Sequence, residues 1–182
     1  MSRPEGPAAN PWSGPESWGS PRERTTTWYD PALIPARSAG LDGLAVMQAV
    51  RDGELPPAPI AALLGMRLVE AERGRVVFEC TPEESMYNPI GVVHGGVACT
   101  LADSAAGCAV HTTLDAGWGY TSIDITVNYL RAVTLDSGVL RATGTVTKPG
   151  RRVALAAAEI HDGAGRLVAT ASSNCFIIQP SG

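Results

Sequence analysis

The sequence predicts an α+β domain in which an antiparallel sheet packs against one long helix. Only one stretch, from Gly96 to about Thr113, has the length and the apolar spacing of a long helix. The strands expected before and after it are joined by short turns, which favours antiparallel pairing. Small residues occupy nearly every face of this helix. We therefore expect it to be deeply buried and packed close to the backbone of the sheet.

The other elements follow from the spacing of apolar residues and from the turns between them. Asp52-Gly53 ends the first helix, residues 56–59 form an extended linker, and residues 162–165 turn the chain into its last strand. The expected order is a short amphipathic helix over 41–50, a helical turn over 60–64, strands over 67–71 and 75–81, the long helix, and strands over 120–133, 139–147, 152–161 and 166–178.

The 182 residues suit one domain with an appended segment. Residues 1–38 hold half of the 14 prolines, so we expect a disordered or extended tail there and a folded domain over 39–182. The formal net charge of -4 argues against a general nucleic-acid binder. No apolar run is long enough for a transmembrane helix. Because no apolar segment follows Arg3, we expect a cytoplasmic protein without a secretory signal.

The residues that could carry chemistry cluster where the long helix begins. Asn88 precedes the run His94-Gly95-Gly96, and Asp103 follows inside the helix. The first N–H groups of a helix are unpaired and lie at the positive end of its dipole, and a glycine lets a ligand approach them closely. A carbonyl oxygen directed at the Gly95 N–H would therefore be polarised. A carboxylate at Asp103, among apolar and small neighbours, costs free energy unless it is paired or used.

The spacing Asn-x5-His-Gly-Gly-x6-Asp of these residues, followed by the strand over 122–131, resembles the hotdog-fold acyl-CoA thioesterases, in particular the phenylacetate-pathway (PaaI-like) group. The resemblance covers roughly residues 41–178. It implies a hotdog fold, in which a curled antiparallel sheet wraps around one long central helix, and hydrolysis of an acyl-CoA to a free acid and CoA. It implies no cofactor, because CoA is part of the substrate. With three histidines, none closely spaced, we expect no metal site either.

The resemblance also assigns roles within the motif. Asp103 acts as general base or as nucleophile, and both roles stay open. Gly95 polarises the thioester carbonyl, and Gly96 helps to bind the substrate. Asn88 orients a water or the thioester, or it only forms a turn. His94 holds the loop by a hydrogen bond or contacts the substrate.

Two further groups are candidates for substrate binding. Ser122, or its neighbour Thr121, contacts the water or the substrate, unless the hydroxyl only bonds to backbone. A basic hairpin could bind the phosphates of CoA, because arginine suits bidentate phosphate contacts, or it could be a solvated turn. The residues of this hairpin are Lys148, Gly150, Arg151 and Arg152.

The distance between Gly95 and Asp103 predicts a shared site. Eight residues of helix rise about 12 Å, which is too far for both groups of one chain to hold the same thioester. If both act, the acid must come from a second subunit whose helix runs antiparallel to the first. The resemblance implies the same pairing, so we expect a homodimer or a dimer of dimers with the site at a two-fold interface. We expect neither a nucleic acid nor a membrane as partner.

Two other functions stay open. A non-catalytic acyl-CoA binder or sensor would keep the glycine-led helix and the basic hairpin but would not need Asp103. A hotdog dehydratase or hydratase generally pairs an acid with a histidine five positions further along the helix. Here that position is Cys108, which weakens the second alternative.

Overall fold

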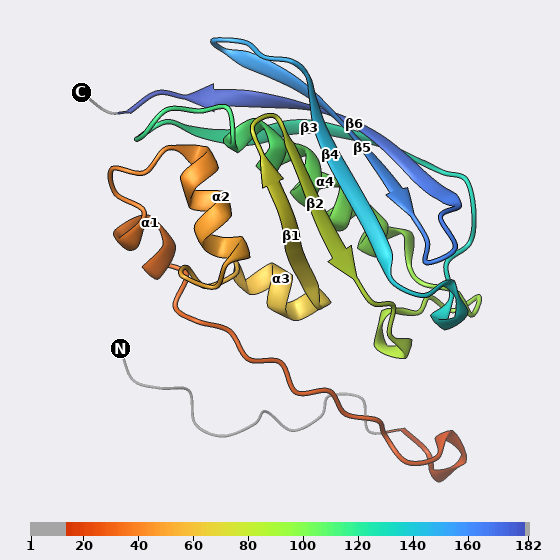
Figure 1. Cartoon of the computed structure of the whole chain (residues 1–182). Coiled ribbons are helices and arrows are strands. Elements are labelled where there is room, and N and C mark those ends of the chain that lie inside the picture. Colours follow the sequence, from red (N-terminus) through yellow and green to blue (C-terminus); the bar gives the residue numbers. More distant parts are fainter. Residues whose placement is uncertain (1–13, 181–182) are drawn as a thin grey trace.

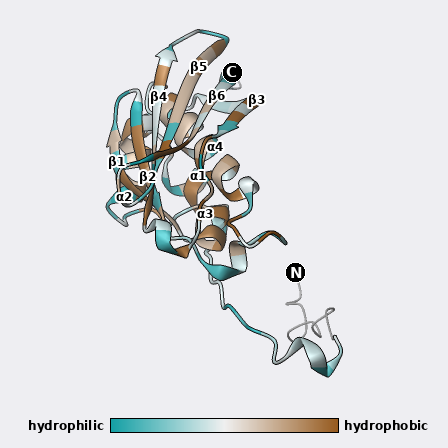
Figure 2. Ribbon diagram, turned by 90° about the vertical axis from the view of Figure 1, so that its right-hand side faces the viewer, coloured by the Kyte–Doolittle hydropathy of each residue, from teal (hydrophilic) through white to brown (hydrophobic). Residues whose placement is uncertain are grey.

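The structure, a computed structural model that describes residues 14–180, confirms the α+β fold (Figure 1). One sheet of six strands, all paired antiparallel, has the order β1-β2-β4-β5-β6-β3. The long helix α4 (Gly95–His111) packs against the strands of this sheet. In the side view the sheet curves around α4, and many positions of both elements are coloured as hydrophobic (Figure 2).

Every helix and strand expected from the sequence is present, with ends shifted by at most a few residues. The strands are β1 (Met66–Glu72), β2 (Arg75–Cys80), β3 (Gly119–Tyr129), β4 (Leu140–Lys148), β5 (Val153–His161) and β6 (Leu167–Ile178). Besides α4, the helices are α1 (Leu33–Arg37), α2 (Gly43–Arg51) and α3 (Pro59–Leu64), with single 3-10 turns η1 (Glu16–Trp18), η2 (Glu84–Met86) and η3 (Leu135–Ser137).

The largest shift is at the end of β3, which was expected to continue to residue 133. The N–H groups of Leu130 and Arg131 both donate to the carbonyl of Val168, so the regular ladder ends after Tyr129. The chain then turns toward η3.

The small residues of α4 bring helix and sheet into backbone contact, as predicted. Ala102, Ala105 and Ala106 are fully or almost fully buried. A Cβ placed on Gly144 of β4 would lie 2.0 Å from the Ala105 carbonyl oxygen. The sheet therefore tolerates no side chain at this position, and the middle of α4 lies directly against the backbone of β4.

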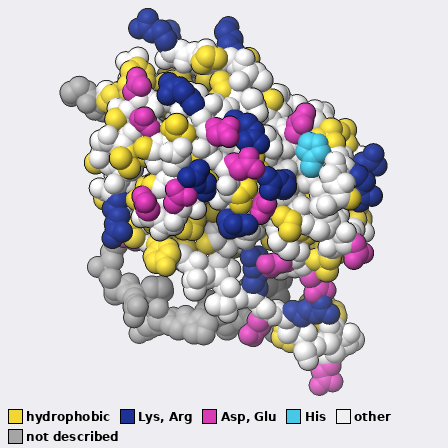
Figure 3. Space-filling model, in the orientation of Figure 1, with side chains coloured by type: hydrophobic (Ala, Val, Ile, Leu, Met, Phe, Trp, Pro, Cys, Tyr) yellow, Lys and Arg dark blue, Asp and Glu magenta, His cyan; other side chains and the backbone are white. Residues whose placement is uncertain are grey.

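The outer face of β1, β2 and β4 is polar. Figure 3 shows basic and acidic side chains intermixed on this face. Arg141 bonds to both Glu70 and Glu79, Arg75 bonds to Glu70, and Arg67 bonds to Glu79, all at 2.5 to 2.7 Å. Such exposed pairs contribute little to stability. No helix within residues 14–180 is both long and apolar enough to cross a membrane.

Residues 1–13 of the expected tail lie outside the described residues. Residues 19–38, which we call the N-terminal strap, run in extended form and then make the helical turn α1, which was not predicted. Arg24 pairs with Glu83 at 3.1 Å, and Arg22 pairs with Glu84. The strap is therefore laid along the domain, and the division of the chain at residue 38 stays a prediction.

Candidate active site

The start of α4 leaves one backbone donor free. His94 is the N-cap residue, and its Nδ1 accepts the Gly96 N–H at 2.8 Å. The Val97 N–H donates to the His94 carbonyl at 2.9 Å. The Gly95 N–H, at the first position of the helix, has no hydrogen-bond partner among the described residues. Of the two roles considered for His94, the structure shows the one that holds the loop, and this leaves Gly95 as a donor at the positive end of the helix.

Tyr129 at the end of β3 fixes Gly95 from the other side. Its hydroxyl donates to the Gly95 carbonyl at 3.1 Å. A Cβ on Gly95 would lie 3.0 Å from the tyrosine ring, so only a glycine fits without displacing it. Sequence reasoning gave Tyr129 no role. The available signal was its place in the strand over 122–131, which contributes to the family resemblance.

Asn88 forms a turn and faces the same space as Gly95. Its Oδ1 accepts the N–H groups of Ile90 and Val92 at 3.1 and 3.3 Å, which confirms the turn-forming role. Its side-chain NH2 makes no bond within the described residues and can still donate. Asn88, His94, Gly95 and Tyr129 line one pocket of about 380 Å³.

Asp103 lies in a second pocket, of about 360 Å³, on the same helix. The carboxylate is half-buried, and the Ser122 hydroxyl donates to its Oδ1 at 2.8 Å. Thr121 is exposed and precedes Ser122 on β3, so its side chain points to the other face of the strand. The structure therefore brings Ser122, and not Thr121, to the acid.

The basic hairpin is not brought to Gly95 within one chain. It joins β4 to β5, and all four of its candidate residues are exposed. Close to the hairpin, the Val146 N–H donates to the Gly74 carbonyl, and the Gly74 N–H donates to Thr112 just after α4. The hairpin thus lies at the end of α4 opposite to Gly95. Gly150 has a steric reason to be glycine, because a Cβ there would lie 1.9 Å from the Val153 carbonyl oxygen.

The two pockets share no lining residue. Gly95 and Asp103 are two helical turns apart, about 12 Å along the axis. Within residues 14–180, no three His, Cys, Asp or Glu side chains gather closely enough to hold a metal ion. One chain therefore presents a polarising N–H group and a hydroxyl-supported carboxylate at two separate places.

A curled antiparallel sheet around one long central helix defines a hotdog fold. The Thioesterase superfamily profile matches residues 90–169. Human acyl-coenzyme A thioesterase 13 is 32% identical over 103 residues, which is 56% of this chain and 72% of that protein. The chain belongs to the thioesterase superfamily and is a thioester hydrolase.

Solved structures agree with this assignment. The Escherichia coli PaaI protein from the phenylacetic acid degradation operon has a TM-score of 0.63 and 25% identity, covering 68% of this chain and 87% of that one. A Streptococcus pneumoniae thioesterase solved with coenzyme A has a TM-score of 0.58 and 29% identity, covering 64% and 91% of the two chains. The resemblance to the PaaI-like group is confirmed.

Proposed function

We propose that the protein hydrolyses acyl-CoA thioesters as a dimer. The Gly95 N–H of one subunit binds the thioester carbonyl, and Asp103 of the other subunit activates water. The observation that carries this proposal is the placement of the two groups in separate pockets about 12 Å apart on one helix. A CoA thioester is supported by the human relative, which is an acyl-CoA thioesterase, and by the pneumococcal structure, which was solved with CoA.

The open edge of β3 supports the pairing of subunits. Among residues 14–180, β3 bonds only to β6, so no described strand pairs with its other edge along residues 119–129. Ile123 and Tyr129 on this strand are 58% and 56% exposed. An open edge with apolar side chains is a template for another strand. Two β3 strands paired antiparallel about a two-fold axis would set the two α4 helices antiparallel, with Asp103 of each facing the Gly95 end of the other.

The chemistry needs only these groups. Asp103 takes a proton from water, and the oxygen of that water attacks the thioester carbon. The negative charge that develops on the carbonyl oxygen is stabilised by the Gly95 N–H. The carbon–sulfur bond then breaks, and CoA leaves as the thiol once it gains a proton. Because Ser122 binds Oδ1 of Asp103, the Oδ2 atom is free to accept the proton.

Attack by Asp103 itself, through an anhydride, would use the same two groups. The two routes differ in which group receives the oxygen atom of the attacking water. In a single turnover in heavy-oxygen water, the general-base route labels only the released acid. Label in the Asp103 carboxylate identifies the nucleophilic route, with water attacking the aspartyl carbon of the anhydride.

The same pairing gives the basic hairpin a role. In an antiparallel dimer, the hairpin of the subunit that supplies Asp103 lies toward the end where the other subunit's α4 begins. Lys148, Arg151 and Arg152 of that subunit could then bind the phosphates of CoA. This assignment rests on the pairing and not on any contact within one chain.

The test is hydrolysis of acyl-CoA, followed by thiol release, in variants of the two groups. We expect Asp103→Asn to lower kcat by about 10² to 10⁴-fold. Asp115→Asn, in the exposed loop after α4, is the charge-matched control. Gly95→Pro removes the N–H while proline remains compatible with the first helical position, and we expect a loss of about 10² or more. Gly95→Ala keeps the N–H and controls for contact with Tyr129.

Mixing the two inactive variants tests the shared site. After subunit exchange, a dimer of Asp103→Asn with Gly95→Pro has one intact site, so a random mixture should recover about a quarter of the wild-type activity. If both groups came from one chain, the mixture would stay inactive. If wild-type protein binds acyl-CoA but does not release thiol, the non-catalytic alternative is correct.

A further inference from the structure

A pocket of about 760 Å³ lies beside α4 and is distinct from the two pockets that hold Gly95 and Asp103. Its size is typical of a site for a small ligand. The deep wall is apolar and comes from α2, β1, β2 and the segment before α3. It includes the buried side chains of Val46, Met47, Leu55, Leu68 and Phe78.

One end of the pocket is lined by the residue that follows the proposed catalytic acid in the sequence. Ser104, which follows Asp103, lines it together with Cys108 and His111. These three residues are spaced by four and three positions, so they share one face of α4. That face runs about 10 Å away from Asp103, toward the end of the helix. The pocket shares no lining residue with the one that holds Asp103, so a chain attached to a thioester at Asp103 would have to pass to the Ser104 side of α4 before it runs along this face.

Charged side chains line part of the pocket, namely Arg37, Arg51, Glu54 and Arg67, whereas the polar groups along α4 are uncharged. The Cys108 thiol and the Tyr120 hydroxyl lie 3.9 Å apart, and the His111 ring packs against the Tyr120 ring. Burial raises the pKa of the Cys108 thiol to about 11 and lowers the pKa of His111. Both side chains are consequently neutral near pH 7. The wall along α4 suits an uncharged chain better than a charged one.

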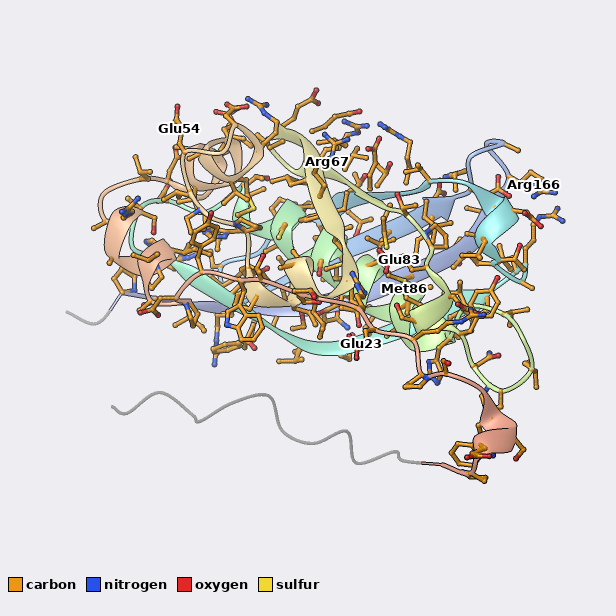
Figure 4. All side chains as sticks on the ribbon, turned by 90° about the horizontal axis from the view of Figure 1, so that it is seen from below. Glu23, Glu54, Arg67, Glu83, Met86 and Arg166 are labelled. Atoms are coloured by element: carbon orange, nitrogen blue, oxygen red, sulfur yellow. The ribbon has the colours of Figure 1, made fainter. Side chains whose placement is uncertain are left out.

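The N-terminal strap forms the outer wall. Tyr29, Leu33, Ile34 and Arg37 line the pocket from this side, and the side chains of Leu33 and Ile34 are half-buried. Seen from below, the strap crosses the underside of the domain, with the labelled Glu23 and Glu83 on neighbouring segments (Figure 4). The Arg24–Glu83 pair anchors the strap before it reaches the pocket.

We propose that this pocket binds the acyl chain of the substrate and that the strap, through Leu33 and Ile34, sets which chain lengths are accepted. The ligand is an uncharged aliphatic chain of medium length, which leaves the thioester at Asp103 and runs along α4 under the strap. The proposal rests on the proposed function, since it places the acyl group relative to Asp103.

Binding and turnover test the proposal separately. Binding of octanoyl-CoA and of CoA is measured by calorimetry on Asp103→Asn protein, which should not consume the ligand. We expect octanoyl-CoA to bind at least about tenfold more tightly than CoA, because the chain leaves water. The double variant Leu33→Ser/Ile34→Ser in this background should lose most of that difference while CoA binding stays the same. Leu41→Ser, an exposed leucine that does not line the pocket, is the control.

The turnover assay uses acetyl-CoA, octanoyl-CoA and palmitoyl-CoA. We expect Leu33→Ser/Ile34→Ser to raise KM for octanoyl-CoA by about tenfold and to leave acetyl-CoA unchanged. Ile34→Trp, which narrows the outer wall, should reduce turnover of palmitoyl-CoA most. Equal effects on acetyl-CoA and octanoyl-CoA, or equal binding of octanoyl-CoA and CoA, would overturn the acyl-pocket proposal. Absence of any turnover would instead refute the proposed function, and the binding result would still decide the pocket.

Discussion

Replacing Ser122 by alanine tests whether the hydrogen bond from its hydroxyl to Asp103 contributes to catalysis. The Ser122 hydroxyl donates to Asp103 at 2.8 Å, and it is the only side chain that bonds this carboxylate among the described residues. A hydrogen bond to a charged group contributes about 1.5 to 3 kcal/mol. With about 1.4 kcal/mol for each factor of ten in rate, the loss of orientation in Ser122→Ala corresponds to a fall in kcat of about 10 to 100-fold.

The neighbouring threonine provides the control. Thr121 points to the opposite face of β3, so Thr121→Ala should leave kcat within about twofold of wild type. The assay is steady-state thiol release from one acyl-CoA at several concentrations, with thermal unfolding to confirm that each variant is folded. Full activity of Ser122→Ala, or an equal loss in Thr121→Ala, would show that the bond to Asp103 does not support catalysis.

Two further predictions concern stability. Gly144→Ala should destabilise the protein by at least about 3 kcal/mol in urea unfolding, because the new Cβ would collide with the Ala105 carbonyl at 2.0 Å. The control is Gly165→Ala, where φ is +77° and no described atom lies within 4 Å of the new Cβ. It should cost only about 1 to 2 kcal/mol. Hydrogen bonds from the Arg166 backbone, and then from its side chain and the Ala164 backbone, lower the pKa of Asp162. Its stabilising contribution is therefore present above the unfolded pKa of about 4 and is lost as pH falls through the lower folded value. The difference in urea midpoint between wild type and Asp162→Asn should shrink as pH falls from about 5 to about 2, and a constant difference would contradict the linkage.

Much of the fold could be predicted because the pattern of apolar and small residues repeats with the period of each element. The alanines of α4 indicated close packing, and the contact between Ala105 and Gly144 shows it. The end of β3 could not be predicted, because no glycine or proline marks it between Tyr129 and Val133. Its end is set by two N–H groups that donate to one distant carbonyl, that of Val168.

The candidate site was partly predictable for a similar reason. Positions along one helix, such as Gly95 and Asp103, have a spacing that can be read from the sequence. The choice between Ser122 and Thr121 depends on which face of β3 meets α4, and this follows only from the sheet register. The sequence did not predict that the strap forms the outer wall of the pocket beside α4, because its composition indicates only an extended segment. Its place depends on ion pairs with Glu83 and Glu84, which lie about sixty residues further along the chain.

Gly95 and Asp103 lie on the same helix, so the number of residues between them determines where Asp103 lies relative to Gly95. Each residue inserted or deleted there would turn Asp103 by about 100° around the axis of α4 and shift it by about 1.5 Å. The carboxylate would leave Ser122 and point toward the sheet or away from β3. Substitutions between the two positions are limited by packing alone, whereas changes in length are excluded by geometry. Homologous enzymes that share this arrangement should therefore vary in the loops around α4 and keep its first two turns free of gaps.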